Sequence, residues 1–422
     1  MLDRLLRTVK RFIPTKLFVA LQPLYHYMLA FAGALIYRFP SKDIFLIGVT
    51  GTKGKTSTIE LANAILEEAG FKTALASTLR IKVGQDSNRN MFKMTMPGRF
   101  FIQRFLRKAV NGGCQYVLLE MTSEGVKLFR HKFIDLNALI FTNLSPEHIE
   151  AHGSYENYIA AKLKIAKALE RSKKGNKVLI VNKDDREAEK FLAIKVPQKF
   201  TYTLGENRLF ALRQEGVELV VDKMRIQTKL VGKFNAYNAL AAATLAKTQS
   251  IDINTIKSAL EKFTGIGGRM ENVNVGQNFS VIVDYAHTPD SLEKVYEVFA
   301  DRRKICVLGG TGGGRDKWKR KTMGAIADKH CSHIILTDED PYDEDPRQII
   351  GNIAEGIENT EYRVSLDRRD AMYSAFKIAR SGDVVIITGK GTDPYIMGSG
   401  GTKTSWDDAS VAREELKKLL RK

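Results

Sequence analysis

The sequence predicts an α/β protein built from two doubly wound domains that follow a short helical amino-terminal arm. Three observations lead to this fold class. A glycine-rich loop near residue 50 joins an apolar run to a helical pattern, strand-like runs then alternate with helical runs, and the alternation restarts after the glycines at residues 265–268. We place the arm at residues 1–42, the central domain at residues 43–266 and the carboxy-terminal domain at residues 267–422.

Composition indicates a globular protein with a strongly basic charge. Of the 422 residues, 27% are charged and 44% are hydrophobic, and the net charge is +18. Such a charge favours an anionic partner, which could be nucleic acid, anionic lipid or a multiply phosphorylated substrate. The basic residues are spread along the chain without interleaved aromatic platforms, so we expect no nucleic-acid module.

The cysteines are few and widely spaced. Cys114, Cys306 and Cys331 lie in apolar or helical surroundings, which is typical of buried thiols in a reducing compartment. The sequence has no zinc-ligand spacing and no evident cleavable signal peptide. We therefore expect a cytoplasmic protein, and a monomer.

The arm differs in composition from the rest of the chain. Basic residues, including Lys10 and Lys16, precede an apolar run from Leu17 to Tyr37 that Pro23 interrupts. The length would suit a membrane span, but the proline and the polar residues argue against one. Two interpretations carry equal weight. One is an interfacial helix pair, residues 1–40, on anionic lipid at the inner face of the membrane, and the other is an arm packed on the protein's own core.

The stretch GVTGTKGKTST, from Gly48 to Thr58, has the features of a phosphate-binding P-loop. An apolar strand precedes it and a helix follows it, and its glycines let backbone amides converge on phosphate oxygens. Lys55 can reach the terminal phosphates, and the hydroxyl of Thr56 can bind Mg²⁺. The spacing is a variant, because Val49 stands where the form GxxxxGK[ST] has its first glycine, and an ordinary tight turn is the alternative. The expected nucleotide contacts are Gly51, Thr52, Lys53, Gly54, Lys55, Thr56 and Ser57.

The remaining elements of the central domain follow in order. Apolar runs predict parallel strands, residues 200–231 predict an antiparallel flap because short strand-like runs alternate with glycines, and two helical patterns close the domain. The predicted strands are Tyr116–Glu120, Ala138–Thr142 and Val178–Val181, and the predicted helices are Asn235–Lys247 and Ile256–Phe263.

The carboxy-terminal domain repeats this alternation and is expected to be Rossmann-like. Asp284 and His287, in DYAHTPD, follow its first strand, and LGGTGGGRDKWKR, residues 308–320, is similar to a second glycine-rich anion loop. The predicted strands are Val281–Asp284, Lys304–Leu308, His333–Thr337 and Asp383–Thr388.

Two polar residues of the central domain follow strand ends, where open α/β sheets meet their ligands. Glu120 ends the strand YVLLE, and its carboxylate can hold Mg²⁺. His148 lies in TNLSPEHIEAHG, after the next strand, and a neutral imidazole can complete a metal shell. A loop histidine with a structural hydrogen bond is the alternative, and the nearby phosphate loop favours the metal site.

The ordered motifs carry a family resemblance. The stretches GTKGKTS, LEMTSEG, TNLSPEH, HGSYENYIAAK, GKFNAYNALAA, GRME, DYAHTPDSL, GGGRDKWKR and GKGTDPY resemble the Mur ligases, most closely their tripeptide-synthetase branch. The resemblance runs from about Ile44 to about Tyr395. It implies an ATP-dependent amide ligase of peptidoglycan precursor synthesis. Such an enzyme phosphorylates the carboxylate of a UDP-MurNAc-peptide, and the amine of an amino acid then attacks the acyl phosphate.

The resemblance also implies roles for the central-domain residues. Lys55 contacts the β- and γ-phosphates, Thr56 and Glu120 bind one Mg²⁺, and His148 binds a second. Lys162 matches the family's carbamylated lysine, whose added carboxylate supports metal. A solvated helix lysine is the alternative at that position.

Further implied roles concern nucleotide and substrate. Asn235 and Asp284 face adenine and ribose, His287 belongs to the same nucleotide site, and Arg269 and Lys317 approach the phosphates when the domains close. The positions that match the site for the acidic sugar peptide are Thr95, Pro97, Ser123 and Arg130.

Several positions depart from the family pattern. About 42 residues precede the first strand, which is too few for the family's usual uridine-binding domain, so the resemblance leaves the carrier of the substrate open. Met96 replaces the second threonine of a TTP stretch, and Glu124 replaces a histidine.

The stretch DEDPY takes the place of the DNPR motif of diaminopimelate-adding members. Asp340 and Tyr342 replace asparagine and arginine, so the far carboxylate of diaminopimelate loses its bidentate partner. Asp338, Glu339, Asp340 and Asp393 make an acidic neighbourhood. The stretch GKGTDPY resembles the GKGAD form of lysine-adding relatives. We expect a basic amino acid such as L-lysine. The alternative is that these acids cap helices or pair with Arg347.

Two rival functions remain. One is another ligase of the superfamily, such as folylpolyglutamate synthase, against which the acidic neighbourhood argues. The other is a non-catalytic, membrane-associated subunit that binds ATP. The presence of all four of Lys55, Glu120, His148 and Lys162 argues against it.

Overall fold

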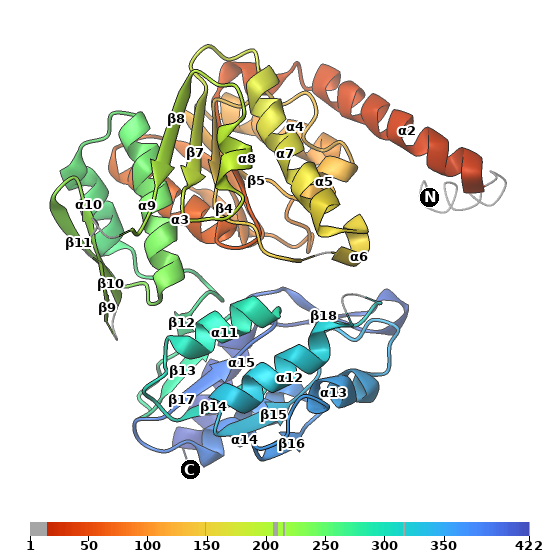
Figure 1. Ribbon diagram of the computed structural model, residues 1–422, viewed down its shortest axis with the longest axis vertical. Helices are drawn as coiled ribbons and strands as arrows, with labels where there is room; N and C mark the ends of the chain where they lie inside the picture. The colour runs from red at the N-terminus through yellow and green to blue at the C-terminus, as the bar shows by residue number, and fades with distance from the viewer. Residues whose placement is uncertain (1–14, 148, 206–209, 214–215, 315–316, 422) are drawn as a thin grey trace.

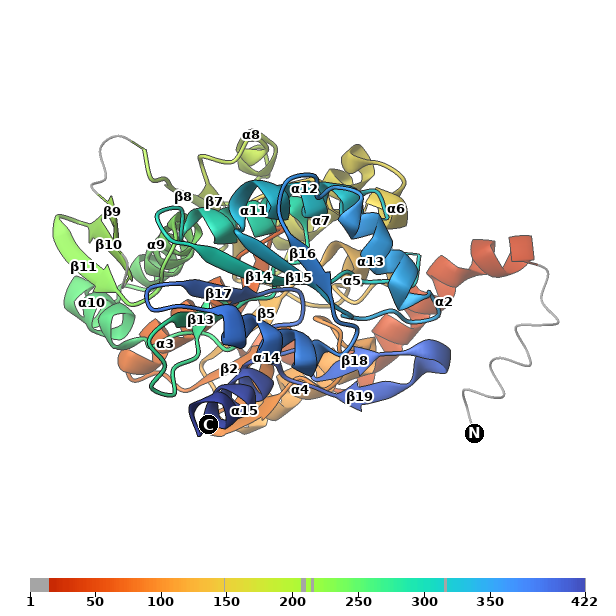
Figure 2. The same ribbon diagram turned by 90° about the horizontal axis from the view of Figure 1, so that it is seen from below.

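The computed structural model describes residues 15–147, 149–205, 210–213, 216–314 and 317–421. Two α/β bodies lie one above the other in Figure 1, with the central domain above and the carboxy-terminal domain below. The helix α2 (Thr15–Ile36) projects from the side of the central domain, at the right of both Figure 1 and Figure 2. The predicted fold class is therefore confirmed.

The strand β1 (Phe45–Thr50) lies inside the central sheet, whose described strands follow the order β4-β3-β2-β5-β1-β6-β7-β8. The strands β2, β5, β1, β6, β7 and β8 pair with their neighbours in parallel. At one edge of the sheet, β3 pairs with β2 and with β4 in antiparallel fashion. The inner strands are nearly continuous apolar runs because helices cover both faces. The other strands are β2 (Thr73–Ala76), β3 (Arg80–Val83), β4 (Asp86–Arg89), β5 (Tyr116–Glu120), β6 (Ala138–Phe141), β7 (Val178–Asn182) and β8 (Gln198–Tyr202).

Two apolar cores hold this sheet between its helices. Ile59 of α3 (Lys55–Glu68) and Leu240 of α9 (Lys233–Thr248) belong to one core, and Phe105 of α4 (Arg99–Asn111) and Tyr158 of α7 (Tyr155–Arg171) belong to the other. The helices are α3 (Lys55–Glu68), α4 (Arg99–Asn111), α5 (Ser123–Lys127), α6 (Ile149–His152), α7 (Tyr155–Arg171), α8 (Ala188–Leu192), α9 (Lys233–Thr248) and α10 (Ile253–Lys262), with a 3-10 turn η1 (Pro40–Asp43). The predicted strands and both predicted helices are present, with ends shifted by up to three residues.

A small antiparallel sheet confirms the predicted flap. Its described strands β9 (Phe210–Arg213), β10 (Gly216–Val221) and β11 (Met224–Thr228) pair in the order β11-β10-β9.

The carboxy-terminal domain is a second doubly wound unit. Its described strands follow the order β12-β13-β17-β14-β15-β16, parallel except for β12. The strands are β12 (Glu271–Asn272), β13 (Ser280–Val283), β14 (Lys304–Leu308), β15 (His333–Leu336), β16 (Tyr362–Val364), β17 (Val384–Ile387) and a hairpin of β18 (Tyr395–Met397) and β19 (Lys403–Ser405). The helices are α11 (Pro289–Glu297), α12 (Lys319–His330), α13 (Pro346–Ala354), α14 (Arg368–Ile378) and α15 (Asp408–Leu420), with a 3-10 turn η2 (Ser399–Gly401).

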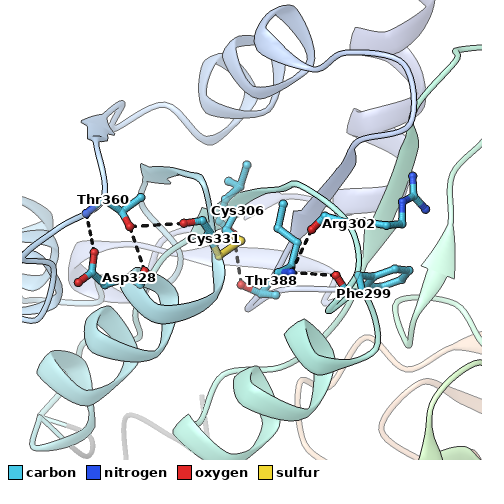
Figure 3. Close-up of a disulfide and its surroundings, with 9 residues drawn as sticks. Phe299, Arg302, Cys306, Asp328, Cys331, Thr360 and Thr388 are labelled. Atoms are coloured by element: carbon cyan, nitrogen blue, oxygen red, sulfur yellow. Dashed lines mark hydrogen bonds between the residues drawn. A yellow bond between two sulfur atoms is a disulfide. The ribbon is translucent and has the colours of Figure 1, made fainter.

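The prediction of free thiols is wrong for two of the three cysteines. Cys306, on β14, and Cys331, at the end of α12, form a disulfide with 6.1 Å between their Cα atoms. The parallel pairing of β14 with β15 brings them together, since Cys331 lies two residues before β15. Figure 3 shows the bond beside Thr360, whose hydroxyl donates to the carbonyl oxygens of Asp328 and Cys331. Cys114 is a buried free thiol, as predicted.

The described part of the arm is one continuous helix, α2, with Pro23 inside it. One side packs on the central domain, where the ring of Tyr27 meets Phe133 and Gly33 lies against Phe100. The other side leaves large apolar residues exposed, including Met28 at 60%. Among the described helices, none combines the length and apolarity needed to cross a bilayer. Lys10 and the rest of residues 1–14 lie outside the described residues.

Candidate functional site

A cavity of about 1480 Å³ lies between the two domains and is lined by both. It brings together most of the residues that the sequence singled out. The predicted residues that line it are Thr52, Lys53, Gly54, Lys55, Thr56, Ser57, Thr95, Glu120, Ser123, Arg130, Lys162, Asn235, Arg269, Asp284, His287, Asp340 and Asp393. Gly51, Pro97, Lys317 and Asp338 do not line the cavity, and His148 lies outside the described residues.

The glycine-rich loop crosses from β1 into α3 in the conformation that a phosphate cradle needs. Gly54 precedes the helix with φ of 80°, and a Cβ atom there would come within 2.3 Å of Asn238 Oδ1. Asn143 fixes the loop, because its carbonyl oxygen accepts from the amide of Thr52 at 2.8 Å and its Oδ1 accepts from the amide of Lys53 at 2.9 Å. The helix that follows adds the positive end of its dipole.

Lys55 is held inside this cradle. Its Nζ donates to the carbonyl oxygen of Thr52 at 2.8 Å and lies 3.9 Å from Glu120 Oε1, with 13% of its side chain exposed. Burial lowers the pKa of Lys55, while the neighbouring Glu120 acts in the opposite direction. The ammonium is therefore poorly compensated until anionic oxygens enter the loop.

Thr56 and Glu120 form the pair of oxygen groups expected for Mg²⁺. Thr56 Oγ1 donates to Glu120 Oε2 at 2.9 Å, and the same oxygen accepts from the amide of Thr78 at 2.8 Å. Mg²⁺ binds in this manner to one carboxylate, phosphate oxygens and waters, so these residues fit the ion beside a bound nucleotide. Within the described residues no cluster of three His, Cys, Asp or Glu side chains forms a complete protein cage.

Lys162 comes from α7 and is almost fully buried, with 2% exposed. Its Nζ donates to the carbonyl oxygen of Gly51 at 2.7 Å and lies 5.0 Å from the ring centre of Tyr158. Burial lowers the pKa of Lys162 well below its ordinary value, and the nearby Lys55 acts in the same direction. The alternative of a solvated helix lysine is therefore wrong.

The carboxy-terminal domain supplies the opposite wall. Arg269 stacks over the ring of Tyr285 at 4.1 Å, and the carboxylate of Asp284 accepts from the amides of Met270 and Ala286 at 2.8 and 2.7 Å. Burial raises the pKa of Asp284, and Arg269 opposes that shift. On the other domain, Asn235 Nδ2 donates to the carbonyl oxygen of Val231 at 2.8 Å.

His287 links the domains through Glu147, a residue that the sequence did not single out. Its Nε2 lies 3.3 Å from Glu147 Oε1, which also accepts from Lys53 Nζ at 2.9 Å, and its Nδ1 bonds the carbonyl oxygen of Tyr285 at 2.8 Å. Burial and the positive charge of Lys53 lower the pKa of His287 to about 4. Glu147 is one residue before His148, so its place in TNLSPEH was the available signal.

Lys317 and Asp338 lie away from the cavity. Lys317 is 58% exposed and its Nζ lies 3.5 Å from Glu344, whereas Lys319, two residues on and 5% exposed, lines the cavity. Asp338 Oδ1 accepts from the amide of Glu339 at 2.8 Å.

The acidic neighbourhood already holds ammonium groups. Asp340 Oδ2 lies 2.6 Å from Lys93 Nζ of the central domain, and Asp340 Oδ1 lies 2.9 Å from the buried Lys390 Nζ. Asp393 Oδ2 lies 3.6 Å from Lys93 Nζ and 3.3 Å from Lys390 Nζ. The predicted pairing of these acids with Arg347 is not observed among the described residues. Nothing in the local sequence around Lys93 pointed to its place beside these acids.

The far end of the cavity carries the predicted substrate residues. Thr95 Oγ1 lies 2.8 Å from Thr78 Oγ1, and Ser123 Oγ lies 3.1 Å from His152 Nε2. Arg130 Nη1 donates to the carbonyl oxygen of Met96. This end therefore offers hydroxyl groups and a guanidinium to a polar, anionic substrate.

The sequence matches two family descriptions in order. The Mur ligase middle domain matches residues 49–246, and the Mur ligase, glutamate ligase domain matches residues 268–391. The UDP-N-acetylmuramoyl-L-alanyl-D-glutamate–2,6-diaminopimelate ligase of Syntrophomonas wolfei is 39% identical over 409 residues, which cover 92% of this chain and 81% of that protein. The UDP-N-acetylmuramyl-tripeptide synthetase of Roseiflexus sp. is 34% identical, covering 95% and 82%.

Solved structures agree with this assignment. A UDP-N-acetylmuramoyl-L-alanyl-D-glutamate–2,6-diaminopimelate ligase matches with a TM-score of 0.61 at 27% identity, over 89% of this chain and 79% of that chain. The folylpolyglutamate synthase of Mycobacterium tuberculosis matches with a TM-score of 0.69 at 14% identity, over 96% and 99%, which shows a shared fold alone. The chain belongs to the Mur ligase family, is most similar to its tripeptide synthetases, and is an ATP-dependent ligase that joins an acid to an amino acid.

Proposed function

We propose that this ligase adds a basic amino acid, such as L-lysine, to the carboxylate of a UDP-MurNAc-peptide-like substrate in cytoplasmic peptidoglycan precursor synthesis, using ATP and Mg²⁺. The observation that carries the proposal is one cavity in which the phosphate loop of one domain faces the Asp340 and Asp393 carboxylates of the other. The names of the relatives, which are ligases of such sugar peptides, support the same substrate class.

The proposed chemistry follows from the low electrophilicity of a carboxylate. A carboxylate oxygen takes the γ-phosphoryl group and ADP leaves, and the amine nitrogen then attacks the carbonyl carbon, releases a proton and expels phosphate. Lys55 and Arg269 offset the charge of the two anions that must meet. Thr56 and Glu120 would hold Mg²⁺, which supplies further charge neutralisation. The interdomain position of the cavity limits the access of water to the acyl phosphate.

The choice of a basic amino acid rests on what the acid pair binds. Lys93 Nζ lies between Asp340 and Asp393, so the site has the charge and spacing to accept a side-chain ammonium. Tyr342 lies in the place where diaminopimelate-adding members carry an arginine, and this favours lysine over an amino acid with a second carboxylate.

The function is tested by phosphate release from ATP with UDP-MurNAc-dipeptide and one amino acid at a time. We expect release with lysine to exceed release with ornithine, diaminopimelate or glutamate. Mass spectrometry of the product identifies the new amide. Release with none of the four would refute the proposed substrates, and glutamate-dependent release with a folate acceptor would favour folylpolyglutamate synthesis instead.

Lys93 competes with a basic substrate for the acid pair. In Lys93→Met, Asp340 and Asp393 keep Lys390 as a counter-ion, but the substrate no longer has to displace Lys93. We therefore expect the KM for lysine to fall about fivefold, which corresponds to the loss of one competing ion pair of about 1 kcal/mol. The KM for ATP should not change. Steady-state kinetics of Lys93→Met and of Lys321→Met, an exposed control on α12, provide the measurement. An unchanged or higher KM for lysine would contradict the competition.

We also propose that α2 touches the membrane surface through its exposed apolar side. Leu24 and Met28 are 56% and 60% exposed, and the chain carries a net charge of +18. Wild-type protein should co-sediment with anionic vesicles, and a Leu24→Glu, Met28→Glu variant should not. Leu212→Glu, at a 55% exposed position of the flap, is the matched control. Equal sedimentation of all three proteins would refute the contact.

A further inference from the structure

Three basic side chains lie close enough to repel one another beside the arm, and Arg130 is the one of the three that lines the cavity. His26 comes from α2, Arg99 is the first residue of α4, and Arg130 follows α5. Both ring nitrogens of His26, Nε and Nη2 of Arg99, and Nε of Arg130 are buried without a hydrogen-bond partner among the described residues. Such an accumulation is unusual, because buried polar atoms in folded proteins are nearly always paired.

The cluster is electrostatically unfavourable as it stands. Burial and the mutual repulsion of the two guanidinium groups lower the pKa of Arg99, and both arginines together with burial lower the pKa of His26. Tyr25 opposes the shift at Arg99, and Glu124 opposes it at Arg130. Neither residue provides a hydrogen bond to the unpaired atoms. Burial of the unpaired atoms and repulsion between the like charges disfavour the cluster, so a bound anion would stabilise it.

The position of the cluster connects it to the substrate. Arg130 lines the cavity and donates through Nη1 to the carbonyl oxygen of Met96, next to Thr95, while its Nε has no partner among the described residues. Helix α4 begins at Arg99 after Gly98 without a side-chain cap, so its dipole adds positive potential at the same place. An anionic group bound here would belong to the same substrate molecule whose neighbouring part contacts Thr95 and Arg130.

We propose that His26, Arg99 and Arg130 bind a phosphate or diphosphate ester group of the sugar-peptide substrate. The inference rests on the proposed function, since it names the part of that substrate which the arm side of the cavity holds. Two guanidinium groups with free N–H donors match the charge and the several acceptor oxygens of a phosphate better than those of a single carboxylate. A nucleoside diphosphate and a polyprenyl diphosphate both carry this group.

The first test compares acceptor substrates in Arg99→Gln and His26→Gln. The acceptors are the same sugar peptide linked to UDP, linked to polyprenyl diphosphate in detergent, and free of phosphate. We expect the KM of whichever diphosphate-linked acceptor the enzyme uses to rise about tenfold or more, with kcat, the KM for ATP and the KM of the phosphate-free acceptor unchanged. The acceptor with the lower wild-type KM identifies the carrier. Arg104→Gln, an exposed change on the same helix, is the control.

A binding measurement keeps the site distinct from the ligase reaction. Calorimetry with inorganic diphosphate on ADP-saturated protein should detect a site in wild type and in Arg104→Gln that is lost in Arg99→Gln, and the melting temperature of Arg99→Gln should not be lower than that of the other two proteins. This result can be obtained even if the proposed amino acid or acceptor is wrong. Equal binding by wild type and Arg99→Gln, or an equal rise of KM for acceptors with and without phosphate, would overturn the proposed site.

Discussion

Replacing Lys55 with alanine should lower amino-acid-dependent phosphate release by about 10²–10³-fold or more, because the variant loses a preorganised positive charge at the transferring phosphoryl group. In the structure, Lys55 Nζ lies within the loop, 2.8 Å from the carbonyl oxygen of Thr52 and 3.9 Å from Glu120 Oε1. Both kcat and the affinity for ATP should fall, since we expect the ammonium to contact the bound nucleotide as well. Phosphate release and fluorescent-nucleotide binding measure the two effects separately.

The same variant has a defined expectation for stability. Burial lowers the pKa of Lys55, so the folded protein binds fewer protons at this position than the unfolded chain. The lysine therefore destabilises the nucleotide-free protein increasingly as the pH falls below the unfolded pKa, and Lys55→Ala removes that penalty. Melting temperatures without nucleotide should not decrease. Lys108→Ala, at an exposed position, controls for loss of a lysine. Full turnover by Lys55→Ala would refute the phosphate-loop assignment.

The parts of the site that follow from local sequence could be predicted. The apolar run, the glycines and the helical pattern define where β1 ends and α3 begins, and these boundaries place Lys55. Glu120 could be placed as well, because it ends an apolar strand, and parallel strands direct their carboxyl ends to one edge of the sheet. The pairing of Val49 with Glu120 in the structure confirms that neighbourhood.

The parts that depend on distant pairs could not be predicted. Lys93 and Asp340 are 247 residues apart and meet only because the two domains face each other. Glu147 and His287 meet for the same reason. Cys306 and Cys331 pair through the order of strands in the sheet, which the spacing of cysteines does not reveal. The start of α12 determines which lysine of this segment lines the cavity. The helix begins at Lys319, and of Lys317 and Lys319 the second lines the cavity.

Replacing Lys162 with alanine should lower turnover on the order of 100-fold. A carbamate forms when a neutral amine nitrogen attacks the carbon of CO2 and releases a proton. The depressed pKa of Lys162 keeps its amine neutral over a wider pH range than that of an exposed lysine. Its donation to the carbonyl oxygen of Gly51 places the nitrogen beside the phosphate loop, where an added carboxylate could support Mg²⁺.

Two readouts distinguish a carbamylated lysine from one that only positions the loop. Acetate or formate should restore part of the activity of Lys162→Ala, since the shortened side chain leaves room for a small carboxylate, but should not restore Lys162→Met. Wild-type activity should fall in CO2-free buffer and return with bicarbonate. If neither carboxylate rescue nor bicarbonate dependence is seen, Lys162 acts through its hydrogen bond to Gly51 alone.

The stability of Lys162→Met tests whether burial of the Lys162 amine destabilises the folded protein. The pKa of Lys162 in the folded protein lies well below the ordinary 10.5. Between these two values the lysine is protonated in the unfolded chain and neutral in the folded protein. The unmodified protein therefore loses stability as the pH falls from about 10.5 towards the folded pKa, and Lys162→Met has no such loss. Melting curves in CO2-free buffer should show a variant that is more stable than wild type at pH 7, with a smaller difference at pH 10. A lower melting temperature at both pH values would mean that the Lys162 amine stabilises the loop more than its burial costs.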